Sequence, residues 1–251
     1  LRMTPAMRGA VRAAGDPVAA QFVPDARELQ VRPEELADPI GDEAHKAAPG
    51  LTHRYPDRVI LHTTHSCEVY CRFCFRREVV GEDGPLPAAD LDAALDYIAA
   101  TPAIWEVILT GGDPMTLSPR RLRAIMDRLS AIPHVDVVRL HTRVPVVAPE
   151  KVTAALVSAL DCRLAVWVVV HTNHAQEITP GAEAAGGDRE NAGSAAVIEN
   201  ALARAQFVQR QRAVQALVLD VGLDHAIGIA GHVGDDAAAL RRLVQALDRH
   251  D

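Results

Sequence analysis

The sequence predicts an α/β fold built on a parallel sheet, and two observations carry this prediction. Short β-rich runs alternate with amphipathic helical segments between residues 58 and 172. Each β-rich run is followed by polar or glycine-rich residues, namely HTTHSC, TGGDP, HTRVP and HTNH. Such alternation is typical of a (β/α) barrel or of a doubly wound sheet. In a barrel, the residues that follow the strands line the carboxyl-terminal mouth, where active sites form.

The expected strands are short and rich in β-branched residues. They are RVILHTT (58–64), WEVILT (105–110), VDVVRLHT (135–142) and RLAVWVVVHT (163–172). The last run is apolar at successive positions, which predicts a strand that is buried on both faces.

Amphipathic segments between these strands predict the connecting helices. Residues 89–100 place four apolar side chains on one helical face, Leu91, Ala94, Leu95 and Ile98. Ser118 and Pro119 form an N-cap and first-turn pair before a second face, made by Leu122, Ile125, Met126 and Leu129. Pro149 opens a third helix, which carries Val152, Ala155, Leu156 and Leu160.

The two ends of the chain lack the regular alternation of strands and helices that the central residues show. Residues 1–50 are punctuated by proline and predict a partly helical arm that wraps residues 51–179, the expected core. Residues 180–251 read as a degraded or divergent continuation, with a flexible loop at 181–194 and a helix at 235–250. The stretch 178–234 lacks the composition of a well-formed strand and helix repeat.

Composition narrows the class of protein. The chain has 251 residues and is 49% hydrophobic, which is sufficient for one sizeable core. Its net charge of −7 gives no support to a nucleic-acid partner. No apolar run reaches the ~18–20 residues of a membrane span, and the first residues have no apolar segment typical of a signal peptide. We therefore expect a cytoplasmic protein without a membrane partner.

Three of the four cysteines lie within residues 67–74 in a C-x3-C-x2-C pattern. Clustered thiols indicate a metal site rather than a disulfide framework. Cys67, Cys71 and Cys74 could ligate three irons of a [4Fe-4S] cluster and leave the fourth iron open to an exogenous molecule. The alternative is structural zinc with His62 or His65 as fourth ligand, although the usual second pair of ligands is missing. Lone Cys162 is interpreted as a small buried apolar residue.

Two further features surround this pattern. Arginines crowd the cysteine segment, and they are Arg54, Arg58, Arg72, Arg76 and Arg77. Arginine forks suit phosphate and carboxylate, which favours an anion site over a solvated basic face. The run Thr110-Gly111-Gly112-Asp113-Pro114 follows the second strand, where glycines allow close approach to the backbone and Asp113 could bind an amino group.

These motifs together resemble the lysine 2,3-aminomutase family of radical S-adenosylmethionine enzymes. The similar blocks are HRYPDRVILHTTHSCEVYCRFCFRREVVG (53–81), WEVILTGGDPMTLSP (105–119), RLHTRVPVVAPEKVT (139–153) and HTNHAQEIT (171–179). The similarity covers roughly residues 20–179. The three-cysteine pattern alone indicates the superfamily, and the combination with LTGGDP and HTRVPVV indicates the aminomutase branch.

The resemblance implies roles for individual residues. Cys67, Cys71 and Cys74 would ligate the cluster. The methionine part of S-adenosylmethionine would lie against Gly111, Gly112 and Asp113, with Asn173 and His174 nearby. The phosphate of pyridoxal phosphate would be held by Arg54, Tyr55 and Arg58. Arg76 would pair with the substrate carboxylate.

The resemblance also implies a fold, a reaction and partners. The fold would be a partial (β/α) barrel of the radical S-adenosylmethionine type, incomplete on its C-terminal side. The reaction would move the α-amino group of L-lysine to the β-carbon, using the cluster, S-adenosylmethionine and pyridoxal phosphate. The partners would be a small amino acid substrate and an electron donor such as flavodoxin or ferredoxin, and a homo-oligomer stays open.

One family feature has no counterpart in the sequence. The only lysines are Lys46 and Lys151, and neither matches the family lysine that binds pyridoxal phosphate covalently. The chain is then either a truncated or frame-disrupted product, which we favour, or a shortened enzyme that does not bind that cofactor covalently. Two further functions stay open: an aminomutase that acts in β-lysylation of elongation factor P, and a non-catalytic iron–sulfur protein.

Overall fold

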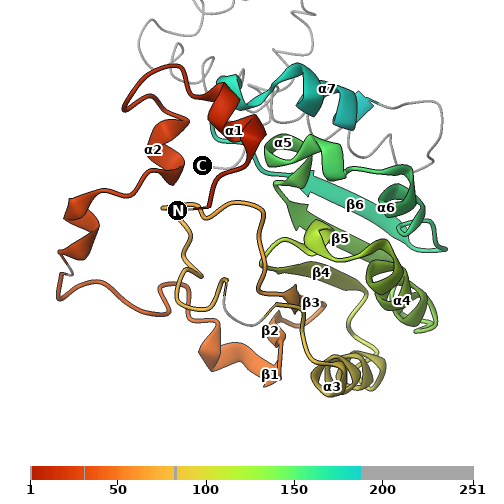
Figure 1. Ribbon diagram of the computed structural model, residues 1–251. Coiled ribbons are helices and arrows are strands. Elements are labelled where there is room, and N and C mark those ends of the chain that lie inside the picture. The colour runs from red at the N-terminus through yellow and green to blue at the C-terminus, as the bar shows by residue number, and fades with distance from the viewer. Residues whose placement is uncertain (1, 31, 82–83, 188–251) are drawn as a thin grey trace, which may run out of the picture. The chain divides into compact units, whose positions relative to one another are not determined.

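A computed structural model describes residues 2–30, 32–81 and 84–187 of the chain, and Figure 1 shows their arrangement. The expected helix at 235–250 and most of the expected divergent continuation lie outside these residues. No helix within the described ranges is long and apolar enough to cross a membrane.

The described residues form one open, mixed sheet with the strand order β1-β2-β3-β4-β5-β6. The strands are β1 (Lys46–Ala48), β2 (Leu51–Tyr55), β3 (Arg58–Thr64), β4 (Glu106–Gly111), β5 (Val137–Thr142) and β6 (Ala165–Val170). The four predicted strands are β3 to β6, and they pair in parallel as expected. The α/β class is therefore confirmed.

Helices connect and cover these strands. The α-helices are α1 (Pro5–Ala10), α2 (Ala19–Phe22), α3 (Ala88–Ala99), α4 (Pro119–Ser130), α5 (Val144–Val147), α6 (Ala154–Ser158) and α7 (Pro180–Gly187). The short 3₁₀ helices are η1 (Ala26–Leu29), η2 (Glu43–His45), η3 (Pro114–Thr116), η4 (Pro149–Lys151) and η5 (Ala175–Glu177). Helices α3, α4 and α6 lie along the same side of the sheet, and the arrowheads of β5 and β6 point toward α1 and α2 (Figure 1).

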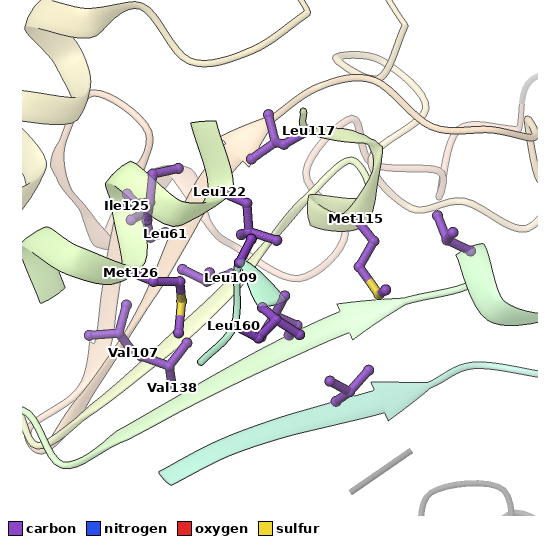
Figure 2. Packing of buried hydrophobic residues seen from close by; sticks show 14 of the residues in the cluster. Leu61, Val107, Leu109, Met115, Leu117, Leu122, Ile125, Met126, Val138 and Leu160 are labelled. Carbon is purple, nitrogen blue, oxygen red and sulfur yellow. The ribbon is translucent and has the colours of Figure 1, made fainter. Parts of the chain in front are cut away.

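Helix α4 anchors the core at the middle of the sheet. It begins where the sequence predicts, because the Ser118 side chain accepts a hydrogen bond from the backbone N–H of Arg121. Its buried residues are the four predicted ones, Leu122, Ile125, Met126 and Leu129. Figure 2 shows three of them above apolar side chains of β3, β4 and β5.

Three predictions about secondary structure were wrong. The segment after Pro149 is not one helix, because η4 ends at Lys151 and the Thr153 side chain caps a separate helix, α6. Strand β6 is buried on one face only, since Ala165, Trp167 and Val169 are exposed in the described part of the chain. Residues 181–187, expected to begin a flexible loop, belong to α7.

The first two strands were not predicted. β1 and β2 pair antiparallel, and β2 pairs antiparallel with β3, which makes the sheet mixed rather than purely parallel. The β2 sequence LTHRY has no clean alternation of apolar and polar residues. Its stability comes from pairing with β3 and from burial of Leu51, which sequence periodicity does not report.

Core packing under α4 gives the first test. Leu122 is fully buried, so Leu122→Ala should lower the free energy of unfolding by about 2–5 kcal/mol through lost burial and a cavity. Exposed Arg120→Ala, on the same helix, is the control and should change it by less than about 0.5 kcal/mol. Urea unfolding followed by circular dichroism measures both, and equal midpoints for the two variants would contradict the packing described.

Candidate functional site

The carboxyl ends of the parallel strands meet at one edge of the sheet, and the cysteines lie in the loop that leaves the first of them. The loop starts after β3 and returns to its own beginning, since the Gly81 N–H donates to the His65 carbonyl at 2.8 Å. The His65 N–H in turn donates to the Gly84 carbonyl at 2.7 Å. The cysteine loop, defined here as residues 65–81, is therefore closed at its base by backbone hydrogen bonds.

The base of the cysteine loop rests directly on the turn that follows β4. The Asp113 N–H donates to the Ser66 carbonyl at 2.8 Å. A Cβ atom at Gly112 would overlap the Ser66 carbonyl oxygen and lie 2.8 Å from the His65 carbonyl carbon. Gly111 has a φ of +104°, a conformation that favours glycine. Gly112 thus admits the cysteine loop at close range, whereas a Cβ atom at Gly111 would meet Thr64 and His62 of β3.

Asp113 fastens this turn to the end of the next strand. Its Oδ1 accepts from the Thr142 hydroxyl at 2.6 Å and from the Met115 N–H at 3.0 Å. Its Oδ2 accepts from the N–H groups of Arg143 at 2.7 Å and Val144 at 3.2 Å. Burial raises the pKa of the Asp113 carboxyl, while these donors stabilise its ionised form. Because four protein donors hold the carboxylate, its role beside an amino group stays a prediction.

The three clustered cysteines are free thiols of intermediate burial. Burial raises the pKa of Cys67 to about 12, and the charges of Asp113, Cys74 and Cys71 add to this effect. Burial also raises the pKa of Cys71, against the opposing charge of Arg143. Each of these thiols would therefore hold its proton near neutral pH until a cation stabilises the thiolate.

The arrangement of the cysteines can be compared with two kinds of metal site. Within the described ranges, no group of three or more histidine, cysteine, aspartate or glutamate side chains gathers about a point that one ion could occupy. A 4Fe-4S cubane places each thiolate on a different iron atom, so its ligands are spread around the cluster. The thiols of Cys71 and Cys74 lie close enough to Cys67 to influence its pKa. Three thiols placed in this way, on a loop fixed at its base, fit that second requirement.

Arg143, directly after β5, links the cysteine loop to the N-terminal arm. Its Nη1 donates to Cys71 Sγ at 3.0 Å. Its Nη2 donates to Glu177 Oε2 at 2.6 Å and to Gln21 Oε1 at 3.0 Å. The Arg143 and Glu177 side chains are only 9% and 0% exposed. A buried ion pair therefore stands directly behind one of the candidate ligands.

Two of the predicted anion-binding arginines converge on Asp42 in the N-terminal arm. Arg76 Nη2 lies 2.9 Å from Asp42 Oδ2, and Arg54 Nη2 lies 3.4 Å from Asp42 Oδ1. Arg54 also donates to the Ile40 carbonyl. A cavity of about 400 Å³ opens beside this group, with Asp42, Arg76 and His62 among its lining residues. Arg54 and Arg76 thus share a carboxylate at the wall of the cavity.

The other two residues predicted to hold a phosphate lie elsewhere. Arg58 begins β3 and pairs with Asp57 at 2.9 Å and with Glu106 at 3.5 Å. The Tyr55 ring lies under the Arg58 guanidinium. A strand of this length places Arg58 about 20 Å from the end that enters the cysteine loop. The phosphate-binding role of Tyr55 and Arg58 stays a prediction.

Asn173 and His174 follow β6 at the same edge of the sheet as the cysteine loop. The Asn173 side chain donates to Gln21 Oε1 at 3.0 Å. His174 Nδ1 accepts from the Gln176 N–H at 3.2 Å and so caps η5. The Phe73 ring of the cysteine loop meets the His171 ring edge-on at 5.7 Å. The structure therefore joins this segment to the cysteine loop, as the strand order predicts.

Several residues of the site were missed by sequence reasoning. Arg143 and Glu177 lie within the quoted blocks HTRVP and HTNHAQEIT, and the position of Arg143 directly after a predicted strand was the available signal. Gln21 and Asp42 come from the proline-punctuated arm, where no periodicity or motif marks them. Their roles depend on contacts between segments far apart in the chain.

The close contact at Gly112 can be tested by adding one methyl group. Gly112→Ala should destabilise the chain by about 1–3 kcal/mol, because the Ser66 backbone must move. Gly9→Ala in α1 is the matched control, since a Cβ there meets nothing within 4 Å, and alanine should stabilise that helix by about 0.5–1 kcal/mol. Urea unfolding and limited proteolysis of the cysteine loop would detect the difference, and equal stability would refute the contact.

His62 on the cavity wall gives a pH-dependent test. Burial, helped by the charge of Arg76, lowers the pKa of His62 to about 4. The unfolded chain takes up this proton near pH 6.5 and the folded chain only near pH 4, so stability should fall as the pH drops between these values. His62→Asn should remove this part of the decline. Denaturation midpoints from pH 7.5 to pH 4 test it, and parallel curves for the two proteins would contradict the assignment.

Comparison with known proteins places this site in a family. No protein-family model matches the chain. It is 41% identical over 170 residues to the L-lysine 2,3-aminomutase of Fusobacterium nucleatum, covering 67% of this chain and 40% of that protein. It is 44% identical over 165 residues to that of Clostridium subterminale, covering 65% of this chain and 40% of that protein.

A third relative carries a different substrate in its name. The chain is 38% identical over 200 residues to the glutamate 2,3-aminomutase of Clostridioides difficile, covering 78% of this chain and 47% of that protein. The chain thus spans less than half the length of these three relatives. These similarities show that the chain belongs to the lysine 2,3-aminomutase family.

Proposed function

We propose that this chain carries the radical-generating half of a 2,3-aminomutase that acts on a free amino acid, with L-lysine as the leading substrate. One observation carries the proposal. Three free cysteines lie on a loop that is closed at its base and packed on Gly112, at the carboxyl ends of the parallel strands β3 to β6. That edge is where α/β proteins assemble their active sites.

The cysteines are proposed to ligate a 4Fe-4S cluster with one open iron. When bound there, the cluster supplies the electron that cleaves S-adenosylmethionine to a carbon radical. The chain's part is to fix the ligands: Gly81 and His65 close the loop, and Asp113 ties its base to β5. We place the methionine part of S-adenosylmethionine beside Gly111 and Gly112, with Asn173 and His174 nearby.

The cavity beside Arg76 is the proposed place of the substrate carboxylate. Arg76 already holds one carboxylate there, that of Asp42, at 2.9 Å. The same geometry suits a carboxylate from an amino acid, because a guanidinium binds either through the same N–H groups. Asp42 would then release Arg76 or share it when the substrate enters.

Pyridoxal phosphate has a smaller part in the proposal. Arg54 fits a phosphate, since its guanidinium already lies beside the Asp42 carboxylate. Arg58 and Tyr55 contact each other at the opposite end of β3. Neither Lys46 nor Lys151 has the position of the family's covalent lysine, and Lys151 pairs with Glu68 at 2.6 Å. We therefore assign no chemical step to pyridoxal phosphate on the described residues.

The proposal extends to fold and partners. Strands β3 to β6 would be the first four of a partial (β/α) barrel of the radical S-adenosylmethionine type, with residues 51–179 as its core and residues 1–50 as an arm. A one-electron donor such as flavodoxin or ferredoxin would reduce the cluster. The family and the run of parallel strands support the inference about the fold, and the donor follows from the electron that the proposed cluster needs.

Iron binding tests the cysteine assignment. Anaerobic reconstitution of the full chain should give about four irons per chain. Cys67→Ala should lower this strongly, whereas Cys162→Ala, which lies outside the loop, should leave it unchanged. Iron, sulfide and zinc analyses of both variants check the prediction, with melting temperatures of the metal-free proteins as a control for folding. Zinc without iron in the unsubstituted chain would refute it.

Turnover separates the activity from its alternatives. The reconstituted chain, given a chemical reductant and S-adenosylmethionine, should release 5′-deoxyadenosine and convert L-lysine to β-lysine. L-glutamate serves as the second substrate, because one relative is named for it. The assay on free lysine also separates this activity from the β-lysylation branch, in which β-lysine is made for the modification of elongation factor P. Cluster assembly without any product would favour the non-catalytic iron–sulfur protein.

A further inference from the structure

We propose that Arg143 is a positioning residue for Cys71 and that the Arg143–Glu177 pair sets the reduction potential of the cluster. The inference rests on the proposed function, because it takes Cys71 as a cluster ligand. It goes further by assigning a role to two buried residues that do not ligate the metal. Their charges act on the cluster through one hydrogen bond to sulfur.

The contact between Arg143 and Cys71 is direct. Arg143 Nη1 donates to Cys71 Sγ at 3.0 Å, a short distance for an N–H···S hydrogen bond. The backbone of Arg143 is itself fixed, because its N–H donates to Asp113 Oδ2 at 2.7 Å. The Arg143 side chain therefore extends to the sulfur from a backbone position that is fixed by a hydrogen bond.

The second terminal nitrogen of the Arg143 guanidinium, Nη2, is also held by hydrogen bonds. Nη2 donates to Glu177 Oε2 at 2.6 Å and to Gln21 Oε1 at 3.0 Å. Gln21 also donates to the other oxygen of Glu177, and the Asn173 N–H reaches that oxygen at 3.3 Å. With Nη2 engaged in this way, Nη1 is left to face the cysteine sulfur.

The surroundings of the pair make its charges effective. The Phe22 and Phe73 rings lie 5.5 Å and 5.6 Å from the Arg143 guanidinium carbon. Arg143 and Glu177 are almost fully buried, as given above. Charges act over greater distances where water is excluded, so the electrostatic effect of this pair reaches the sulfur with little screening.

The direction of the effect follows from charge. One-electron reduction by an external reductant adds one negative charge to the cluster and its ligands. The Arg143 charge and its N–H···S hydrogen bond stabilise this reduced form. Glu177 opposes them, because its negative charge partly neutralises the guanidinium. Loss of the Arg143 charge should make reduction harder, and loss of the Glu177 charge should make it easier.

The test is a potentiometric titration of the full, reconstituted chain with dithionite, followed by electron paramagnetic resonance. Arg143→Met should lower the equilibrium constant for reduction by about tenfold, equivalent to about 59 mV for a one-electron couple. Glu177→Gln should raise it, and Arg143→Lys, which keeps the charge, should lie closer to the unsubstituted chain. Arg120→Met removes an exposed charge on α4 and should have no effect.

The outcomes decide between the inference and the proposed function. Opposite shifts for Arg143→Met and Glu177→Gln support the inference. Unchanged potentials, or shifts in the same direction, overturn it while the cluster assignment stands. If Arg143→Met does not fold, the direction of the Glu177→Gln and Arg143→Lys shifts decides. An unsubstituted chain that binds no cluster overturns the proposed function, and the role of Arg143 with it.

Discussion

The Asp113 carboxylate is the interaction on which the rest of the site depends. Its four donors come from the turn after β4 and from the end of β5, so one buried group holds two strand ends in register. The backbone N–H of Asp113 donates to the Ser66 carbonyl in the cysteine loop, and the Asp113 side chain accepts from the backbone N–H of Arg143. Without these hydrogen bonds, the cysteine loop and the Arg143–Glu177 ion pair would not be held in fixed positions relative to each other.

Much of the fold could be predicted from the sequence because its strongest signals are local. The apolar face of α4 and its Ser118 cap depend on residues within one helix, and both were predicted correctly. The four parallel strands also follow from short β-rich runs. The failures have physical causes of another kind: β2 is stabilised by pairing with β3, and the exposed face of β6 depends on what covers the strand rather than on its apolar sequence.

The residues of the candidate site also divide into those with a local sequence signal and those without one. Cys67, Cys71, Cys74 and the two glycines could be proposed as site residues from the sequence, because each group lies within a few residues and forms a recognisable motif. Gly112 admits the cysteine loop at close range, a contact that only the folded structure reveals. Buried partners such as Gln21 and Glu177 are separated by more than 150 residues from one another. Hydrogen-bonding partners so far apart in the chain have no local sequence pattern, so the sequence did not predict the role of Gln21 or of Glu177.

Three cysteines that hold a cluster would leave one of its irons open to S-adenosylmethionine. Mössbauer spectroscopy of the ⁵⁷Fe-reconstituted full chain, with and without S-adenosylmethionine, can detect such an iron. One iron of four should change its isomer shift and coordination when S-adenosylmethionine is added, while the other three stay as they are. Spectra that are identical in both samples, or a preparation that binds zinc in place of iron, would contradict it.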